Sequence, residues 1–225
     1  VSRDAKYVVG SGPYKLDKWI TGQSVTLSRN DNYWNIKEFP NYPAKIIFKT
    51  IQDQNAAVVA AKNKETDYMT VIQPIDFVEN VKDPEQYNLK KSLVTEPSYS
   101  YIAWNNKSPL FSDKNVRWAM SYAIDRQSIL NSVVYGMGTL IQSPIFIKSK
   151  YYDSDLKVIP YDPAKSKELL AAAGWKDSDG DGILDKVIDG KKMDFKFTFI
   201  NNNNPKRKKV MLIIIQNLKQ LGIQA

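Results

Sequence analysis

Apolar and polar residues alternate along much of the first half of the chain, which is typical of strands that bury one face. Two such runs, Tyr14–Ile20 and Ser24–Arg29, are joined by a turn at Thr21–Gln23 and predict a hairpin. Asp53 can cap a helix rich in alanine and valine. The other elements expected in this half are a short helix at Pro74–Val81 and strands at Lys45–Ile51, Thr66–Thr70, Tyr87–Thr95 and Ser98–Asn105.

Beyond about residue 106 the apolar spacing changes to that of amphipathic helices, which places a domain boundary there. The clearest helix has an apolar face made of Val116, Ala119, Met120, Ala123 and Ile124. A strict alternation predicts one strand with Phe195, Phe197 and Phe199 on the same face. Three further helices are expected, each opened by a capping side chain and closed at a glycine: residues 125–136, 162–174 and 204–222. Asp125 and Arg126 are expected to cap and pin helices rather than to contact a ligand.

The composition matters for what it lacks, because the 225 residues include no cysteine and no histidine. Their absence excludes disulfides, sulfur-bound zinc and every catalytic site that needs a thiolate or an imidazole. An enzyme would have to rely on Asp, Glu, Lys, Tyr or Ser. Ser154 and Lys157 have the Ser-x-x-Lys spacing of serine acyl enzymes, but the companion motifs of those enzymes are missing. The composition therefore favours binding over catalysis.

The formal net charge of +8 permits nucleic-acid binding without requiring it. The densest basic stretch comprises Lys191, Lys192, Lys196 and residues 206–209. These side chains flank a predicted strand and occupy the first turn of a predicted helix, so a solvated face is the better interpretation. A nucleic-acid-binding module remains the alternative from a different class, and no nucleic-acid partner is expected.

Four aspartates in a short glycine-rich stretch form the sharpest chemical signal. Asp177, Asp179 and Asp181 alternate ahead of Gly182, which resembles the first half of a calcium loop, and Asp185 could complete the shell. The bidentate glutamate of such a loop is replaced by Ile188. The alternative is a solvent-exposed turn, because aspartate and glycine are common in turns. A structural calcium ion is thus one of two open interpretations, and no other cofactor is expected.

Aromatic side chains gather near the proposed boundary. Tyr99, Tyr101 and Trp104 lie on or beside one predicted strand, and Asn105 follows directly. Aromatic faces at a domain junction suit a ligand with apolar and amide surface. We take Trp104 and Asn105 as the main candidates for ligand binding and the two tyrosines as further ones, although packing in a sheet would explain the tyrosines equally well. No catalytic residue is expected.

Seven stretches of the sequence together resemble one family. They are Val9–Leu16 with Trp19 and Gly22, Arg29–Trp34, Glu65–Asp67, Trp104–Asn105, Val116–Arg126, Tyr161–Lys165 with Leu169–Trp175, and Leu218–Ile223. In order and spacing they are similar to motifs of the bacterial extracellular solute-binding proteins of family 5, the oligopeptide- and dipeptide-binding components of ABC importers. Lys64 stands where that family has glycine, and Trp104 where it has phenylalanine.

The resemblance implies an α/β fold of the type II periplasmic-binding-protein kind, with two partial lobes of mixed sheet and flanking helices. Residues 1–105 would belong to lobe one and residues 106–225 to the first half of lobe two, with the main ligand contacts in parts of the protein outside this sequence. The implied protein is a monomeric receptor, periplasmic or lipid-anchored at the bacterial cell surface, with its anchor outside this sequence. It would bind a short peptide between its lobes and deliver it to an ABC transporter permease without catalysing a reaction. A nickel chelate, an oligosaccharide or a signalling peptide is the alternative solute.

Overall fold

The computed structural model describes residues 8–38, 42–70, 72–202 and 204–225. The chain divides into two compact units. One combines the chain up to Ile72 with Asp83–Leu89, and the other combines Gln73–Lys82 with Lys90–Ala225. The boundary expected near residue 106 lies further along the chain than this division, and the assignment of residues 1–105 and 106–225 to two lobes stays a prediction.

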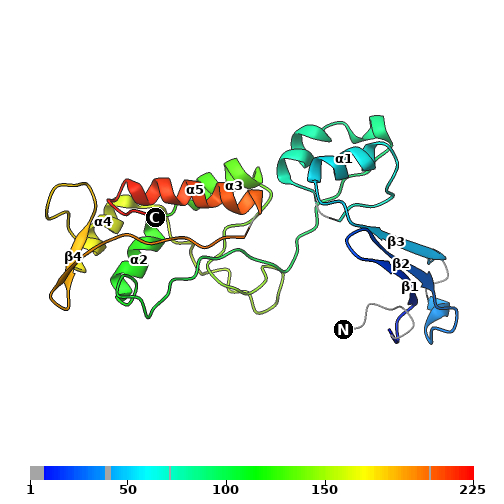
Figure 1. The fold of residues 1–225 in the computed structure, drawn as a ribbon, viewed down its shortest axis with the longest axis horizontal. Helices are drawn as coiled ribbons and strands as arrows, with labels where there is room; N and C mark the ends of the chain where they lie inside the picture. Colours follow the sequence, from blue (N-terminus) through cyan, green and yellow to red (C-terminus); the bar gives the residue numbers. More distant parts are fainter. Residues whose placement is uncertain (1–7, 39–41, 71, 203) are drawn as a thin grey trace. The chain divides into compact units, whose positions relative to one another are not determined.

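The first unit is built on a three-stranded antiparallel sheet in the order β1, β2, β3 (Figure 1). β1 and β2 have the predicted bounds, Tyr14–Ile20 and Ser24–Arg29, and β3 covers Lys45–Lys49. The turn between β1 and β2 is tight because Gly22 adopts a φ of 73°, which glycine reaches without strain. The unit also contains η2 (Ile36–Glu38), α1 (Gln54–Lys62) and η4 (Pro84–Tyr87). Asp53 caps α1 as expected, since its carboxylate accepts a hydrogen bond from the Ala56 amide at 2.8 Å.

The second unit is mainly helical. Its helices are η3 (Asp76–Asn80), α2 (Lys114–Tyr122), α3 (Arg126–Val134), α4 (Pro163–Ala172) and α5 (Pro205–Lys219). A hairpin of β4 (Asp185–Ile188) and β5 (Lys191–Asp194) lies between α4 and α5, and the sequence pattern did not predict it. In the described part of the chain, no helix is both long enough and apolar enough to span a membrane.

The core of the second unit forms where α2 packs on α4. Val116, Ala119 and Met120 of α2 are fully buried, which confirms the predicted apolar face. The hydroxyl of the buried Ser166 in α4 donates a hydrogen bond to the carbonyl of Ala119 at 2.9 Å, and these two small residues let the helices approach closely. The core continues through the ends of α4 and α5 at Leu170 and Leu218.

The predicted caps of the second unit are confirmed. Asp125 accepts hydrogen bonds from the Ser128 amide at 2.9 Å and from its hydroxyl at 2.6 Å, which fixes the start of α3. The guanidinium of Arg126 donates to the carbonyl of Ser121 at 2.8 Å and ties the end of α2 to α3. Partial burial of this guanidinium lowers the pKa of Arg126 from its ordinary value. Both side chains therefore pin helices, as expected.

Several predicted strands are wrong. Residues 66–70 and 98–105 are not in strand conformation, and the stretch 87–95 follows the 3₁₀ turn η4 without forming a strand. Among the described residues, those at 92–104 make no backbone–backbone hydrogen bond, so an alternating sequence there lacks the partner that a strand requires. The strand expected at residues 195–199 is reduced to a single parallel bridge between Lys196 and Gln224.

Candidate functional site

Trp104 is half-buried and belongs to an aromatic cluster that we define as Trp104, Phe111, Phe195, Phe197 and Phe199. The Trp104 ring lies 5.0 Å from Phe111, 5.9 Å from Phe199 and 6.1 Å from Phe197, measured between ring centroids. Phe195 is the completely buried member of the cluster. These separations are those of favourable tilted and edge-to-face pairs. Trp104 is thus held by packing at the edge of the core, with part of its ring open to solvent.

Tyr99 and Tyr101 form a separate aromatic pair. Their centroids are 5.7 Å apart, and the residues are 50% and 74% exposed. Ile102 and Trp104 pack against the core, whereas the tyrosines do not, as expected when neighbouring side chains of an extended chain point to opposite sides. The tyrosines therefore present accessible rings and hydroxyl groups that no core contact requires.

Asn105 is exposed and shapes the turn that follows Trp104. Its side-chain oxygen accepts a hydrogen bond from the Lys107 amide at 3.1 Å, and its carbonyl accepts one from the Ser108 amide at 2.9 Å. The side-chain nitrogen of Asn105 is a hydrogen-bond donor that neither of these bonds uses. The four predicted binding residues thus lie in three different environments: Trp104 in the aromatic cluster, the tyrosine pair on the surface, and Asn105 in a turn.

The sequence analysis missed a groove beside the aromatic cluster. The groove has a volume of about 600 Å³ and is lined by Phe197, Phe199, Met211 and Ile215 together with Lys196, Thr198, Gln224 and Ala225. Its apolar wall comes from the alternating phenylalanines and from one face of α5. The alternation that predicted a strand at residues 195–199 was the available signal, because it places Phe197 and Phe199 on one side.

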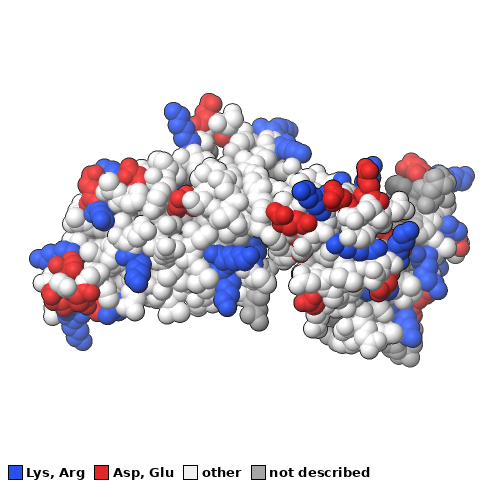
Figure 2. All heavy atoms as spheres, turned by 90° about the horizontal axis from the view of Figure 1, so that it is seen from above, with Lys and Arg blue, Asp and Glu red and all other residues white. Residues whose placement is uncertain are grey.

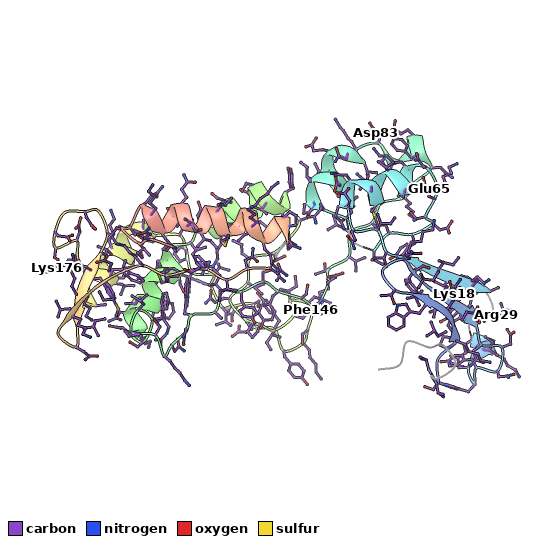
Figure 3. The ribbon with its side chains drawn as sticks, viewed as in Figure 1. Lys18, Arg29, Glu65, Asp83, Phe146 and Lys176 are labelled. Carbon is purple, nitrogen blue, oxygen red and sulfur yellow. The ribbon has the colours of Figure 1, made fainter. Side chains whose placement is uncertain are left out.

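The acidic loop, Asp177–Asp185, follows α4 and runs into strand β4, and Lys176, the residue before the loop, is labelled beside that strand in Figure 3. Asp177 accepts hydrogen bonds from the amides of Gly180 at 2.8 Å and Gly182 at 3.0 Å. The buried Asp185 accepts bonds from the amide and the hydroxyl of Ser178. These bonds to side chains fold the loop without any regular secondary structure.

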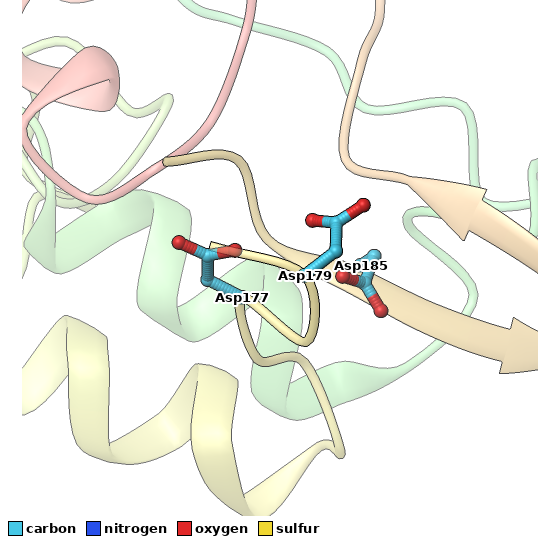
Figure 4. A group of neighbouring side chains, drawn as sticks. All are labelled: Asp177, Asp179 and Asp185. Atoms are coloured by element: carbon cyan, nitrogen blue, oxygen red, sulfur yellow. The ribbon is translucent and has the colours of Figure 1, made fainter. Parts of the chain in front are cut away.

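Three of the four predicted calcium ligands come together in the acidic loop. Asp177, Asp179 and Asp185 each offer an oxygen within 4.8 Å of the others (Figure 4). Asp181 lies outside this group and accepts a hydrogen bond from the Ile183 amide. The carboxylates thus approach the spacing of a cation site, but with fewer acidic ligands than the sequence spacing suggested.

A lysine side chain lies beside this carboxylate cluster. The ammonium of Lys192, on β5, donates a hydrogen bond to Asp179 and lies 3.6 Å from the Oδ2 atom of Asp185. The hydrogen bond from Lys192 lowers the pKa of Asp179, and those from Ser178 lower the pKa of Asp185. Calcium takes six to eight oxygen ligands, and the cation nearest to these carboxylates in the structure is the ammonium of Lys192. A calcium ion at this cluster stays a prediction.

Charge on the second unit does not single out a nucleic-acid surface. On the face seen in Figure 2, basic and acidic side chains are interspersed. Residues 206–209 at the start of α5 are exposed, and in the described part of the chain they form no salt bridge, which agrees with a solvated face.

Comparison with known proteins finds one family. The sequence model of the family described as "Bacterial extracellular solute-binding proteins, family 5 Middle" matches residues 2–225. The oligopeptide-binding protein AppA of Bacillus subtilis is 39% identical over 224 residues, which are 97% of this chain and 39% of AppA. The structure of AppA in complex with a nonapeptide is 37% identical, with a TM-score of 0.75 over 96% of this chain and 41% of that one.

A second solved structure has the same fold. NikZ from Campylobacter jejuni, in complex with Ni(L-His), is 27% identical, with a TM-score of 0.80 over 95% of this chain and 41% of that one. The expected α/β fold of the type II periplasmic-binding-protein kind is confirmed by these matches. The chain spans about 39% of the length of AppA, the first of its curated relatives. Since the family description covers nearly every residue, this chain belongs to the bacterial extracellular solute-binding proteins of family 5.

Proposed function

We propose that the protein containing this chain is the extracellular receptor of an ABC-type peptide importer. It binds short peptides reversibly in a cleft between two lobes and releases them to a permease. The observation that carries the proposal is the likeness to AppA, which is 37% identical over 96% of this chain in a structure that contains a nonapeptide. No bond is made or broken in this function, so the protein needs no catalytic residue.

Trp104, Asn105, Tyr99 and Tyr101 are proposed to contribute to the peptide site. The exposed tyrosine rings can stack on peptide side chains, and their hydroxyls can hydrogen-bond to a peptide backbone. Asn105 adds an amide donor next to the tryptophan. Groups of this kind recognise the features that all peptides share, so we expect tolerance of different side chains.

The remaining parts of the proposal concern the whole protein. We place residues 1–105 in lobe one and residues 106–225 in the first half of lobe two, with hinge closure around the ligand. The protein acts as a monomer, either in the periplasm or held at the cell surface by a lipid anchor. Nucleic acid is not a partner.

A calcium ion at Asp177, Asp179, Asp181 and Asp185 stays a hypothesis. An ion there would be structural, and it would have to displace Lys192 and recruit Asp181 or backbone oxygens. Such an ion would stabilise the folded state when calcium is added, whereas the contact between Lys192 and Asp179 leads us to expect no such effect.

Calorimetry on the full-length protein tests the peptide proposal, with mixed short peptides in one arm and Ni(L-His) in the other. Peptide binding supports the proposal, whereas binding of the nickel complex alone would assign the protein to another solute within the same fold. The site assignment is tested by Tyr101→Ala, with Tyr151→Ala as its control because Tyr151 is exposed to the same degree, 73% against 74%. Equal peptide affinity in these two variants would remove Tyr101 from the site.

A further inference from the structure

The acidic loop is folded by its own donors. Both carboxylate oxygens of Asp177 accept backbone amides, and both oxygens of Asp185 accept bonds from Ser178. Asp181 accepts the Ile183 amide. The hydrogen bonds account for the loop's shape but do not neutralise its carboxylates, so negative charge gathers where oxygens of Asp177, Asp179 and Asp185 lie within 4.8 Å of one another.

The cation nearest to that charge comes from the neighbouring hairpin. Lys192 lies opposite Val187 in the β4–β5 register, and its side chain reaches back to Asp179 and towards Asp185. Asp185 is only 3% exposed, and a buried carboxylate needs a counter-charge or hydrogen bonds. We propose that Lys192 is the built-in cation of the acidic loop and that it takes the place that a calcium ion holds in loops of similar sequence.

The position of Lys192 gives it an advantage over a free ion. A lysine fixed on a hairpin is present at a high effective concentration beside the carboxylates, so a dissolved cation has to compete with it. The salt bridge is also part of a junction in the fold. The Leu184 amide donates to the carbonyl of Gly222 at 2.7 Å, and the backbones of Lys176 and Asp185 pair in an isolated antiparallel β-bridge. Through Asp185, Lys192 therefore contacts the point at which the acidic loop enters the hairpin.

Hydrogen–deuterium exchange on the full-length protein tests this proposal, because it reads the acidic loop directly in a large molecule. The signal is exchange of the amides of Ser178, Gly180, Gly182 and Ile183, each of which donates to a loop carboxylate. Wild type is measured in millimolar calcium and in chelator. Lys192→Met removes the charge and keeps most of the side-chain length.

Two variants serve as controls for Lys192→Met. Lys191→Met changes the neighbouring exposed lysine of β5, which forms no salt bridge in the described part of the chain, and Lys192→Arg keeps the charge. We expect exchange in wild type to be the same with and without calcium. We also expect several-fold faster loop exchange in Lys192→Met, with near-wild-type exchange in both controls.

Any of three results would overturn the proposal. Slower loop exchange of wild type in calcium would show that the metal, and not Lys192, is the loop's cation. Unchanged exchange in Lys192→Met, or equal acceleration in Lys191→Met, would show that the ammonium of Lys192 has no specific part in holding the loop. A circular dichroism spectrum of each variant separates local opening from a failure to fold.

Discussion

Replacing Trp104 by alanine should destabilise the protein and not only alter its ligand affinity. Replacing a fully buried tryptophan by alanine lowers the free energy of unfolding by about 3–5 kcal/mol. Trp104 is half-buried, so we scale this to roughly 2 kcal/mol, part of which is the loss of its ring contacts with Phe111, Phe197 and Phe199. Trp104→Phe keeps an aromatic ring at this position and should lower the free energy of unfolding by about 1 kcal/mol or less.

The assay is urea unfolding of the full-length protein followed by circular dichroism, with the midpoint and slope fitted together. Trp34→Ala is the matched control, because Trp34 is 81% exposed and its loss removes little packing. We expect the order wild type, Trp34→Ala, Trp104→Phe, Trp104→Ala from most to least stable. A Trp104→Ala protein as stable as Trp34→Ala would refute the view that the aromatic cluster holds Trp104 in place.

Three further predictions follow from the same contacts. Tyr99→Ala and Tyr101→Ala should each weaken peptide binding about three- to tenfold without a change in unfolding midpoint, which calorimetry and urea unfolding measure in parallel. Asp125→Ala should cost about 0.5–2 kcal/mol because α3 loses its cap, whereas Asp125→Asn should retain most of that stability in the same unfolding assay. Asp179 and Asp185 have lowered pKa values, so the stability they contribute is present above the ordinary carboxyl pKa near ~4 and is lost as pH falls through the lowered values. Melting temperatures across this range should fall less steeply in Asp179→Asn than in wild type, and identical slopes would contradict the assignment.

Elements with local signals could be predicted from the sequence. The hairpin of β1 and β2 depends on a glycine turn between two short alternating runs, and all of that information lies within about 16 residues. The starts of α1 and α3 depend on a single capping aspartate each, Asp53 and Asp125. Such features are decided within a few residues, so the sequence alone was sufficient for them.

Strands that need a distant partner could not be predicted. The alternation at residues 98–105 is compatible with Trp104 packing on the core while Tyr101 does not, but it could not supply a neighbouring strand. The calcium interpretation, one of two left open for the acidic loop, likewise depended on aspartate spacing alone. The spacing within the acidic loop carries no information about Lys192, which lies 13 residues beyond Asp179 and reaches it only because β4 and β5 pair.

The four predicted binding residues differ in how firmly the fold holds them, and this difference decides which experiments are informative. Trp104 is fixed by three phenylalanine rings, so a substitution there changes stability and binding together. Tyr99 and Tyr101 touch each other but are not part of the core, so their loss should leave stability unchanged. A drop in peptide affinity caused by the tyrosine variants can therefore be attributed to lost ligand contacts, whereas the same drop in Trp104→Ala could come from a displaced cluster. The tyrosine pair is for this reason the decisive place to test the proposed peptide site.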